Sequence, residues 1–212
     1  MSLGILGGTF NPIHRAHLRL ADAARRELDL ARVRFVPAGD PPLKRSGIAP
    51  APHRLEMVRR AVRGRSGFEV DDIEVTRSGP SYTIDTLRAL SGGDGARAPW
   101  FVCGADALAE IEAWRDFERL FDYAHFAVAP RPGQAHSLEA LLPAGLARAF
   151  EPAPRGWRHR SGHALRMLPF ELSELSASDV RARIARGQKI DDLVPGEVAR
   201  YIDEHQLYRE VD

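Results

Sequence analysis

The feature that most constrains the fold of this 212-residue chain is the alternation of short apolar runs with helical patterns. Runs rich in β-branched or aromatic residues span residues 3–6, 33–36, 68–75, 100–103, 125–129 and 164–168. Between them, apolar side chains recur at helical spacing over residues 14–28, 54–62 and 82–90. This alternation is typical of βαβ units. We therefore predict an α/β fold: a Rossmann-like, open, mostly parallel sheet with helices on both faces.

Several segments interrupt or follow this pattern. Residues 37–52 hold five prolines and two glycines, and residues 129–133 and 152–162 are similar, so we expect loops there. Near the C-terminus, two helices are predicted at the positions 178–186 and 197–206, separated by 187–196. We expect one domain over 1–212, in which residues 178–212 form a small helical part.

Composition narrows the class of protein. Hydrophobic residues make up 44% and charged residues 28%, which is ordinary for a globular chain. The net charge of +1 gives no general attraction to nucleic acid or to an anionic membrane. No apolar run is long enough for a transmembrane helix, and the N-terminal segment lacks the basic residues of a signal peptide. The single cysteine, Cys103, leads us to expect a cytoplasmic protein. Because the net charge is close to zero, any anion binding is expected to come from a local site.

The first motif follows the first predicted strand and reads Gly7-Gly8-Thr9-Phe10-Asn11-Pro12-Ile13-His14-Arg15-Ala16-His17. Glycines here let the backbone turn sharply or approach a ligand, and the following helix N-terminus attracts anions. His14 and His17 share one face of the first helical turn, where two imidazoles can bind phosphate oxygens. Each feature alone is more often an ordinary turn or a solvated surface. Together they indicate a phosphate site that is neither a P-loop nor a dinucleotide fingerprint.

Further segments narrow the interpretation. They are Pro41-Pro42-Leu43-Lys44-Arg45, Ser81-Tyr82-Thr83-Ile84-Asp85-Thr86-Leu87, Gly104-Ala105-Asp106-Ala107-Leu108 with Trp114, Arg131-Pro132-Gly133 and Leu175-Ser176-Ala177-Ser178-Asp179-Val180-Arg181. In this order and spacing, they resemble the bacterial nicotinate-nucleotide adenylyltransferases, a family of the nucleotidyltransferase superfamily. The resemblance runs from Leu3 to about Arg209, which is nearly the whole chain.

Three positions depart from the motifs of that family. Asn11 stands where many members have Asp, Ala16 replaces a glycine, and Leu43 replaces a histidine. Asn11 keeps its hydrogen-bonding capacity but has no charge, and Ala16 is small enough to fit. At position 43 a contact made by an imidazole is lost, while Lys44 remains.

The resemblance implies a reaction in NAD biosynthesis. The phosphate of nicotinate mononucleotide would attack the α-phosphorus of ATP, giving nicotinate adenine dinucleotide and pyrophosphate. Because a phosphate nucleophile is largely ionised near neutral pH, no strong general base is required. Catalysis would then rest on alignment and on stabilisation of charge. Mg²⁺ is expected with ATP, held mainly by its phosphates rather than by a protein metal site.

The resemblance also assigns residues to the two substrates. The catalytic contacts with phosphate would come from His14, His17, Lys44 and Arg181. ATP would be bound by Gly7, Gly8, Thr9, Phe10, Gly104, Ser176 and Ser178. The mononucleotide would be bound by Tyr82, Thr83, Asp106 and Trp114. In this assignment Trp114 stacks on the pyridine ring, and the Tyr82–Thr83 segment contacts the carboxylate.

Structural interpretations compete for some of these residues. Ser176 and Ser178 would cap the late helix, Asp106 would cap an earlier one, and Trp114 would lie in the core. Lys44 would be a solvated loop residue. Outside the motifs, Cys103 is interpreted as a buried strand residue rather than a nucleophile. The basic and aromatic patch formed by Trp157, Arg158 and Arg160 is interpreted as part of a solvated loop.

Other functions stay open at this point. Transferases of the same superfamily act on nicotinamide mononucleotide, phosphopantetheine or a cytidylyl acceptor, although the chain length and the Trp114 segment disfavour the phosphopantetheine type. A non-catalytic nucleotide-binding module would be expected to lack His14, His17 or Arg181, and all three are present. A nucleic-acid-binding protein is supported only by scattered arginines. Both a monomer and a homo-oligomer are compatible with the sequence.

Overall fold

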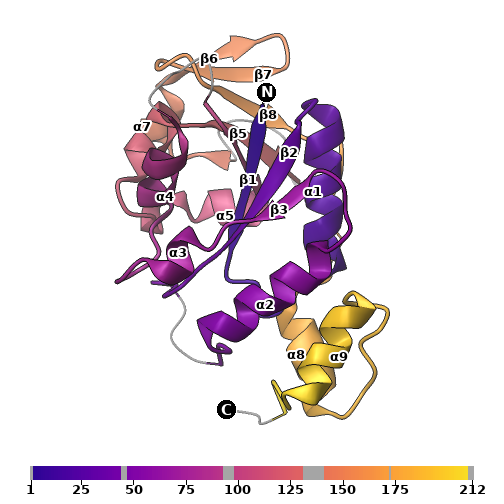
Figure 1. Ribbon diagram of the computed structural model, residues 1–212. Helices are drawn as coiled ribbons and strands as arrows, with labels where there is room; N and C mark the ends of the chain where they lie inside the picture. Colours follow the sequence, from indigo (N-terminus) through magenta and orange to yellow (C-terminus); the bar gives the residue numbers. More distant parts are fainter. Residues whose placement is uncertain (1, 44–46, 93–97, 131–140, 172, 210–212) are drawn as a thin grey trace.

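The computed structural model describes residues 2–43, 47–92, 98–130, 141–171 and 173–209 (Figure 1). Within this part of the chain, one sheet has the strand order β3-β2-β1-β4-β5-β8-β7-β6. Its strands are β1 (Leu3–Gly8), β2 (Arg32–Pro37), β3 (Phe68–Val70), β4 (Trp100–Gly104), β5 (His125–Ala129), β6 (Phe150–Ala153), β7 (Gly156–His159) and β8 (Ala164–Met167). Neighbours from β3 to β8 are parallel, whereas β7 is antiparallel to both β6 and β8. The predicted α/β fold with a mostly parallel sheet is confirmed.

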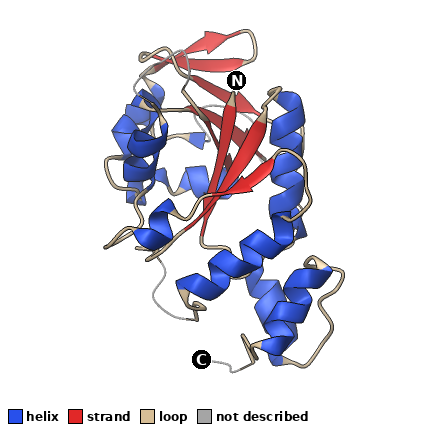
Figure 2. Ribbon diagram, viewed as in Figure 1, coloured by secondary structure: helices blue, strands red, loops and turns tan. Residues whose placement is uncertain are grey.

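Helices cover both faces of the sheet (Figure 2). One face is covered by α1 (Arg15–Glu27), α2 (Ala51–Val62), α8 (Ala177–Ala185) and α9 (Gly196–Glu204). The other is covered by α3 (Ile73–Thr76), α4 (Thr83–Leu90), α5 (Ala105–Ala109), η2 (Ile111–Ala113), η3 (Phe117–Asp122) and α7 (Ala144–Ala147). None of the helices in the described ranges is long and apolar enough to span a membrane.

The central strands are apolar along their whole length because both faces of the sheet are buried. In β5, Phe126 and Val128 pack into the core on one face, whereas Ala127 and Ala129 pack into the core on the other. All four side chains are fully buried. A parallel strand covered by helices on both faces reads as a continuous apolar run, and this is why the central strands could be predicted from sequence.

The strand predicted over residues 68–75 is wrong in its second half. β3 ends at Val70, and the short helix α3 begins at Ile73. The Asp71 side chain favours the change, because its Oδ1 accepts a hydrogen bond from the Ile73 N–H at 3.0 Å; the helical turn then begins with a 2.9 Å bond from the Thr76 N–H to the Asp72 carbonyl. These bonds start a helical turn in a segment of otherwise strand-like composition.

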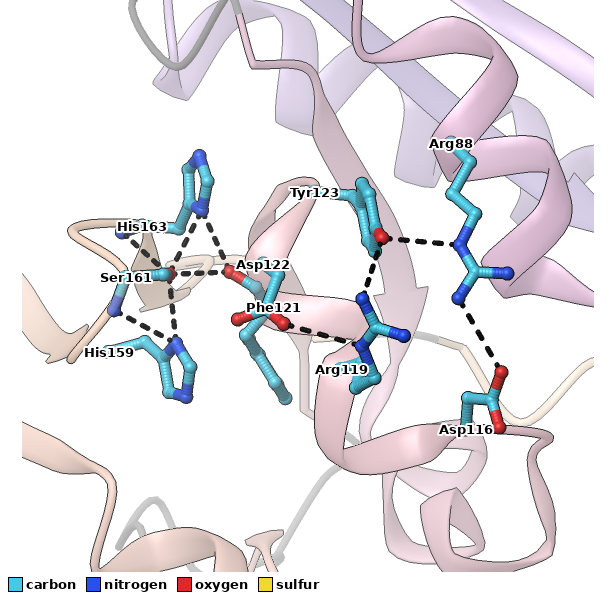
Figure 3. A network of polar contacts seen from close by, with 9 residues as sticks. All are labelled: Arg88, Asp116, Arg119, Phe121, Asp122, Tyr123, His159, Ser161 and His163. Atoms are coloured by element: carbon cyan, nitrogen blue, oxygen red, sulfur yellow. Dashed lines mark hydrogen bonds and ion pairs between the residues drawn. The ribbon is translucent and has the colours of Figure 1, made fainter. Parts of the chain in front are cut away.

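The loop predicted over residues 152–162 is also wrong, because β6 and β7 form an antiparallel hairpin there. Pro152 is compatible with a strand because β6 lies at the edge of the sheet. Figure 3 shows how the end of the hairpin is attached: Ser161 Oγ and His163 Nδ1 both contact the Phe121 carbonyl at 2.7 Å. Trp157 is therefore a partly buried strand residue, while Arg158 and Arg160 are exposed.

The two predicted C-terminal helices are confirmed as α8 and α9. The second of them packs on α2 (Figure 1): the Arg60 guanidinium lies 4.3 Å from the centre of the Tyr201 ring, and Arg60 Nη1 lies 3.5 Å from Glu204 Oε2. Val180 of α8 and Ile202 of α9 belong to the same core as α1 and α2. This packing brings the α8 N-terminus close to the first motif.

Candidate active site

The order of the strands predicts where a ligand would bind. The chain runs from β1 outwards to β2 and β3, and then returns to β4 on the other side of β1. In an open parallel sheet, ligands bind at the carboxyl ends of strands beside such a reversal. A cleft of about 490 Å³ opens there, lined among others by Gly8 at the end of β1 and Cys103 near the end of β4. Its volume is within the usual range for small-molecule sites.

Most of the predicted binding residues meet in this cleft although they come from distant segments. Those that line it are Gly7, Gly8, Thr9, Phe10, His17, Tyr82, Thr83, Asp106 and Trp114. The others with described positions, which lie outside the lining, are His14, Gly104, Ser176, Ser178 and Arg181. Lys44 and the Arg131-Pro132-Gly133 segment lie outside the described residues.

The turn after β1 differs from the prediction in one respect. Gly7 and Gly8 are the last residues of the strand, and the left-handed residue of the turn is Phe10, with φ of 47°. A side chain at either glycine would meet aromatic carbons only at 3.5 Å, which is an ordinary contact. The sharp turn therefore does not depend on the glycines. They leave the end of β1 open towards the cleft, which agrees with the close approach of a ligand.

The two histidines share one face at the start of α1, as predicted. His14 is the N-cap residue, and its ring stacks on that of His17 with 3.7 Å between centroids. The His14 backbone N–H donates to His17 Nδ1 at 3.2 Å, so a neutral His17 carries its proton on Nε2. His14 is 5% exposed, whereas His17 lines the cleft. Ala16 is buried in the same turn, as its small size allows.

The contacts of Asn11 explain why this chain has asparagine where many members of the family have aspartate. Its side-chain Nδ2 donates to the Gly47 carbonyl at 2.7 Å, and its Oδ1 accepts from the Ala49 N–H at 3.0 Å. An ionised aspartate cannot donate to a carbonyl, so the amide suits the loop of this chain. The Asn11 carbonyl also accepts a hydrogen bond from Arg181 Nη1 at 2.9 Å.

Arg181 connects the start of α8 to the first motif. Besides Asn11, Arg181 contacts Ser178 Oγ at 3.3 Å. Ser176 is the N-cap residue, as its structural interpretation predicted, and it forms a capping box with Asp179. Hydrogen bonds from Ser176 hold the pKa of the Asp179 carboxyl below its usual range. Sequence reasoning missed Asp179, although a Ser-x-x-Asp pattern was its signal.

The opposite end of the cleft is formed by aromatic and basic side chains. Trp114 is half-buried and packs edge-on against Phe101, with 5.9 Å between ring centroids. The Arg115 guanidinium lies 4.8 Å from the centre of the Tyr82 ring and also lines the cleft. Sequence reasoning missed Arg115, whose only signal was its place directly after Trp114. Tyr82 is the N-cap residue of α4 and Thr83 its first residue, so the predicted helix start is confirmed.

Glu74, Asp106 and Cys103 also line the cleft and differ from or refine the sequence predictions. Glu74 was expected in a strand but is a buried residue of α3, where Thr86 Oγ1 donates to its Oε1 at 2.6 Å. Burial raises the pKa of the Glu74 carboxyl. Asp106 is the second residue of α5, and Gly104 is the N-cap residue, so the capping interpretation of Asp106 is wrong. Burial raises the pKa of the Cys103 thiol to about 12, which agrees with a buried, unreactive residue.

Comparison with known proteins agrees with this geometry. The cytidylyltransferase-like family model matches residues 5–183. A relative from Citrifermentans bemidjiense is 44% identical and one from Bordetella pertussis 40% identical; each match covers 98% of both chains, and each protein is named "Probable nicotinate-nucleotide adenylyltransferase". A solved structure of Plasmodium falciparum nicotinic acid mononucleotide adenylyltransferase complexed with NaAD superposes with a TM-score of 0.72 at 20% identity, covering 98% of this chain and 97% of that one. That structure supports the fold alone.

The cleft beside the strand reversal, next to two glycines at the end of β1 and two histidines at the start of α1, agrees with a nucleotidyltransferase, the class that the family model shows. The family model places the class among the cytidylyltransferase-like enzymes. Within that class, the chain belongs to the nicotinate-nucleotide adenylyltransferase family, as the full-length relatives establish. The family predicted from the motifs is thereby confirmed.

Proposed function

We propose that this protein joins nicotinate mononucleotide to the adenylyl group of ATP, releasing pyrophosphate. The observation that carries the proposal is that a single cleft collects the phosphate-binding turn after β1 and the aromatic segment around Trp114. The two substrates would lie end to end between these groups. The mononucleotide phosphate then meets the α-phosphorus of ATP above the end of β1.

At the phosphate end, His17 is the main catalytic residue of the proposal. Its Nδ1 accepts a backbone hydrogen bond, so the Nε2 proton is the donor that a phosphate oxygen would use. His14 supports His17 by ring stacking, and Arg181 supplies a guanidinium beside the turn. A fixed donor of this kind stabilises charge that develops in the transition state. Lys44 stays a proposed contributor from outside the described residues.

The other residues assigned to ATP lie in or beside the same cleft. Thr9 and Phe10 would contact ATP from the turn after β1, and Gly7 and Gly8 would let it approach the backbone. Gly104, Ser176 and Ser178 stand near the cleft rather than in it. We assign them to ATP as neighbours of Cys103 and Ala177, which line the cleft.

At the acid end, the start of α4 would bind the nicotinate carboxylate. The first N–H groups of a helix lack partners within the helix and favour an anion. Arg115 over the Tyr82 ring adds a positive charge there. Trp114 would stack on the pyridine ring, and Asp106, exposed in the lining, would accept hydrogen bonds from the ribose hydroxyls.

We further propose that Mg²⁺ accompanies ATP. Mg²⁺ prefers oxygen ligands and keeps several waters, so the phosphates would supply most of its coordination. Asp106 and Glu110 are exposed carboxylates of the lining that could hold such water molecules. The ion would reduce the charge repulsion between the two phosphate groups. We also propose a cytoplasmic, single-domain enzyme, active as a monomer or a homo-oligomer.

The test is pyrophosphate release with ATP and each candidate mononucleotide, together with the mass of the dinucleotide formed. Nicotinate mononucleotide should give stoichiometric pyrophosphate and nicotinate adenine dinucleotide. Turnover with phosphopantetheine or a cytidine nucleotide instead would contradict the proposal.

A further inference from the structure

We infer that Arg54 is a positioning residue that fixes the position of the two ends of the cleft relative to each other. Its side chain is 1% exposed and is not among the residues that line the cleft, although it lines a neighbouring pocket with Pro41, Pro42 and Tyr82, which the cleft shares. Because its donors bind backbone carbonyls, we place it as a support of the cleft and not as a substrate contact. The inference rests on the proposed function, since it uses the assignment of one end to ATP and the other to the mononucleotide.

Among the described residues, the hydrogen bonds of the Arg54 guanidinium go to backbone carbonyls. Its Nη1 donates to the Thr9 carbonyl at 2.8 Å and to the Ala38 carbonyl at 2.5 Å. Its Nη2 donates to the Gly39 carbonyl at 2.9 Å, and its Nε to the Ala49 carbonyl at 2.8 Å. One planar group therefore joins the turn after β1, the segment after β2 and the segment just before α2. A guanidinium can do this because its donors have a fixed, forked geometry.

A second set of hydrogen bonds joins the segment after β2 to the start of α4, the end of the cleft assigned to the nicotinate carboxylate. Ser81 Oγ accepts from the Gly39 N–H at 2.8 Å and from the Asp40 N–H at 3.3 Å. The Ser81 N–H donates to the Asp40 carbonyl at 2.8 Å. Since Ser81 directly precedes Tyr82, the start of α4 is fixed to the same segment that Arg54 holds. The connection from Thr9 to Tyr82 thus passes through Arg54, Gly39 and Ser81.

This connection matters because the reaction depends on the alignment of two substrates bound by different segments. Each end of the cleft has its own local support: His17 by α1, and Trp114 by packing on Phe101. Losing Arg54 would leave each end able to bind its substrate but would change their relative placement. A misplacement of about 1 Å can cost on the order of 100-fold in rate.

The inference predicts a particular kinetic signature. Arg54→Lys keeps the charge and the aliphatic stem but cannot hold carbonyls of three segments in one plane. The value of kcat per folded molecule should fall by about 10- to 100-fold, while KM for ATP and KM for nicotinate mononucleotide each stay within about threefold. A residue that only stabilises the fold would lower the melting temperature and leave kcat per folded molecule unchanged.

Two further variants make the test independent of folding losses at position 54. Ser81→Ala removes the second part of the connection with a very small change, and it should give the same signature with a smaller loss. The double variant should lose less than the product of the two single losses, because both act on one connection. Arg59→Lys is the matched control on the same helix, where the side chain is exposed and paired with Asp72; its kcat should equal that of the wild type.

The experiment is steady-state kinetics of the wild type and the four variants with both substrates varied, normalised to the folded fraction measured by circular dichroism. A fall in kcat with both KM values kept, in Arg54→Lys and in Ser81→Ala, supports the inference. Unchanged kcat per folded molecule, or a rise confined to one KM, overturns it while the proposed function stands. A wild-type protein that releases no pyrophosphate from ATP and nicotinate mononucleotide overturns the proposed function, and the inference with it.

Discussion

Buried and partly buried polar side chains gather in two regions of this molecule, at the cleft and at the β5–β8 side of the sheet, and the two regions use them differently. At the cleft, Arg54 and Asn11 bind the backbone of loops. On the other side, His125 Nδ1 accepts from the Ala164 N–H at 2.8 Å, and His163 contacts the Phe121 carbonyl (Figure 3). Side chains in both regions hydrogen-bond to backbone groups, so polar burial alone does not identify a functional site.

The two sets of side chains differ in whether they titrate and in what surrounds them. The guanidinium of Arg54 and the amide of Asn11 keep their protonation state across the physiological pH range. Burial lowers the pKa of His125 to about 4 and also lowers the pKa of His159, so both imidazoles favour the neutral form. Asn11 lines the open cleft and Arg54 binds the turn beside it, whereas His125 stacks on the Trp100 ring and His159 lies against the Phe150 ring. Changes in the cleft should therefore affect turnover, and changes among the histidines should affect stability.

The largest effect is expected from His17→Ala. The phosphate loses a fixed donor, so kcat should fall on the order of 10²–10³-fold. The melting temperature should stay close to that of the wild type, because His17 is at the N-terminus of α1 and only partly buried. Activity assays and thermal melts measure both, with His205→Ala, an exposed histidine after α9, as the control. Full activity in His17→Ala would remove this residue from the mechanism.

The second prediction concerns the histidines and the pH dependence of stability. An unfolded histidine titrates near 6.5, whereas the folded pKa of His125 is about 4. Between these values the unfolded state binds a proton and the folded state does not, so the free energy of unfolding decreases as pH falls from about 6.5 to about 4. His125 alone should contribute on the order of 2–3 kcal/mol of this decrease. Above pH 7 it should contribute no slope.

Urea unfolding at pH 7 and pH 5 tests this point. His125→Asn retains an acceptor near the Ala164 N–H but does not titrate, so its stability should change less between the two pH values. Equal slopes for His125→Asn and the wild type would contradict the assignment.

The sequence predicted the residues that line the cleft better than the residues that hold those segments in place. The central strands and the helix starts at His14, Thr83 and Ser176 have strong local signals, namely continuous apolar runs, a motif and a cap. The β6–β7 hairpin was missed because an edge strand tolerates Pro152, which otherwise indicates a loop. Arg54 was missed because its partners are backbone carbonyls, which leave no pattern in the side chains. Which residues meet across the sheet depends on the strand order, and spacing does not encode it.

The smallest effect is expected from Arg115→Ala at the acid end of the cleft. The side chain is exposed, so its attraction for the nicotinate carboxylate is weakened by solvent. The value of kcat/KM for nicotinate mononucleotide should fall about three- to tenfold, and that for nicotinamide mononucleotide should hardly change. Arg119→Ala, an exposed arginine of η3 outside the cleft lining, is the matched control. Equal losses for both substrates would assign Arg115 to folding or to general charge.

The central claim is that the start of α4 and its neighbours select a carboxylate, and the most direct measurement is the ratio of kcat/KM for the acid and amide mononucleotides at saturating ATP. The helix start offers donors to the acceptors of a carboxylate, whereas a carboxamide would turn its own N–H₂ towards them. A mispaired buried polar group costs roughly 1–3 kcal/mol, and loss of the attraction between the helix terminus and the charge adds about 0.3–1 kcal/mol. The account predicts that the wild type prefers nicotinate mononucleotide by about 10- to 1000-fold. Equal efficiencies, or a preference for the amide, would contradict it.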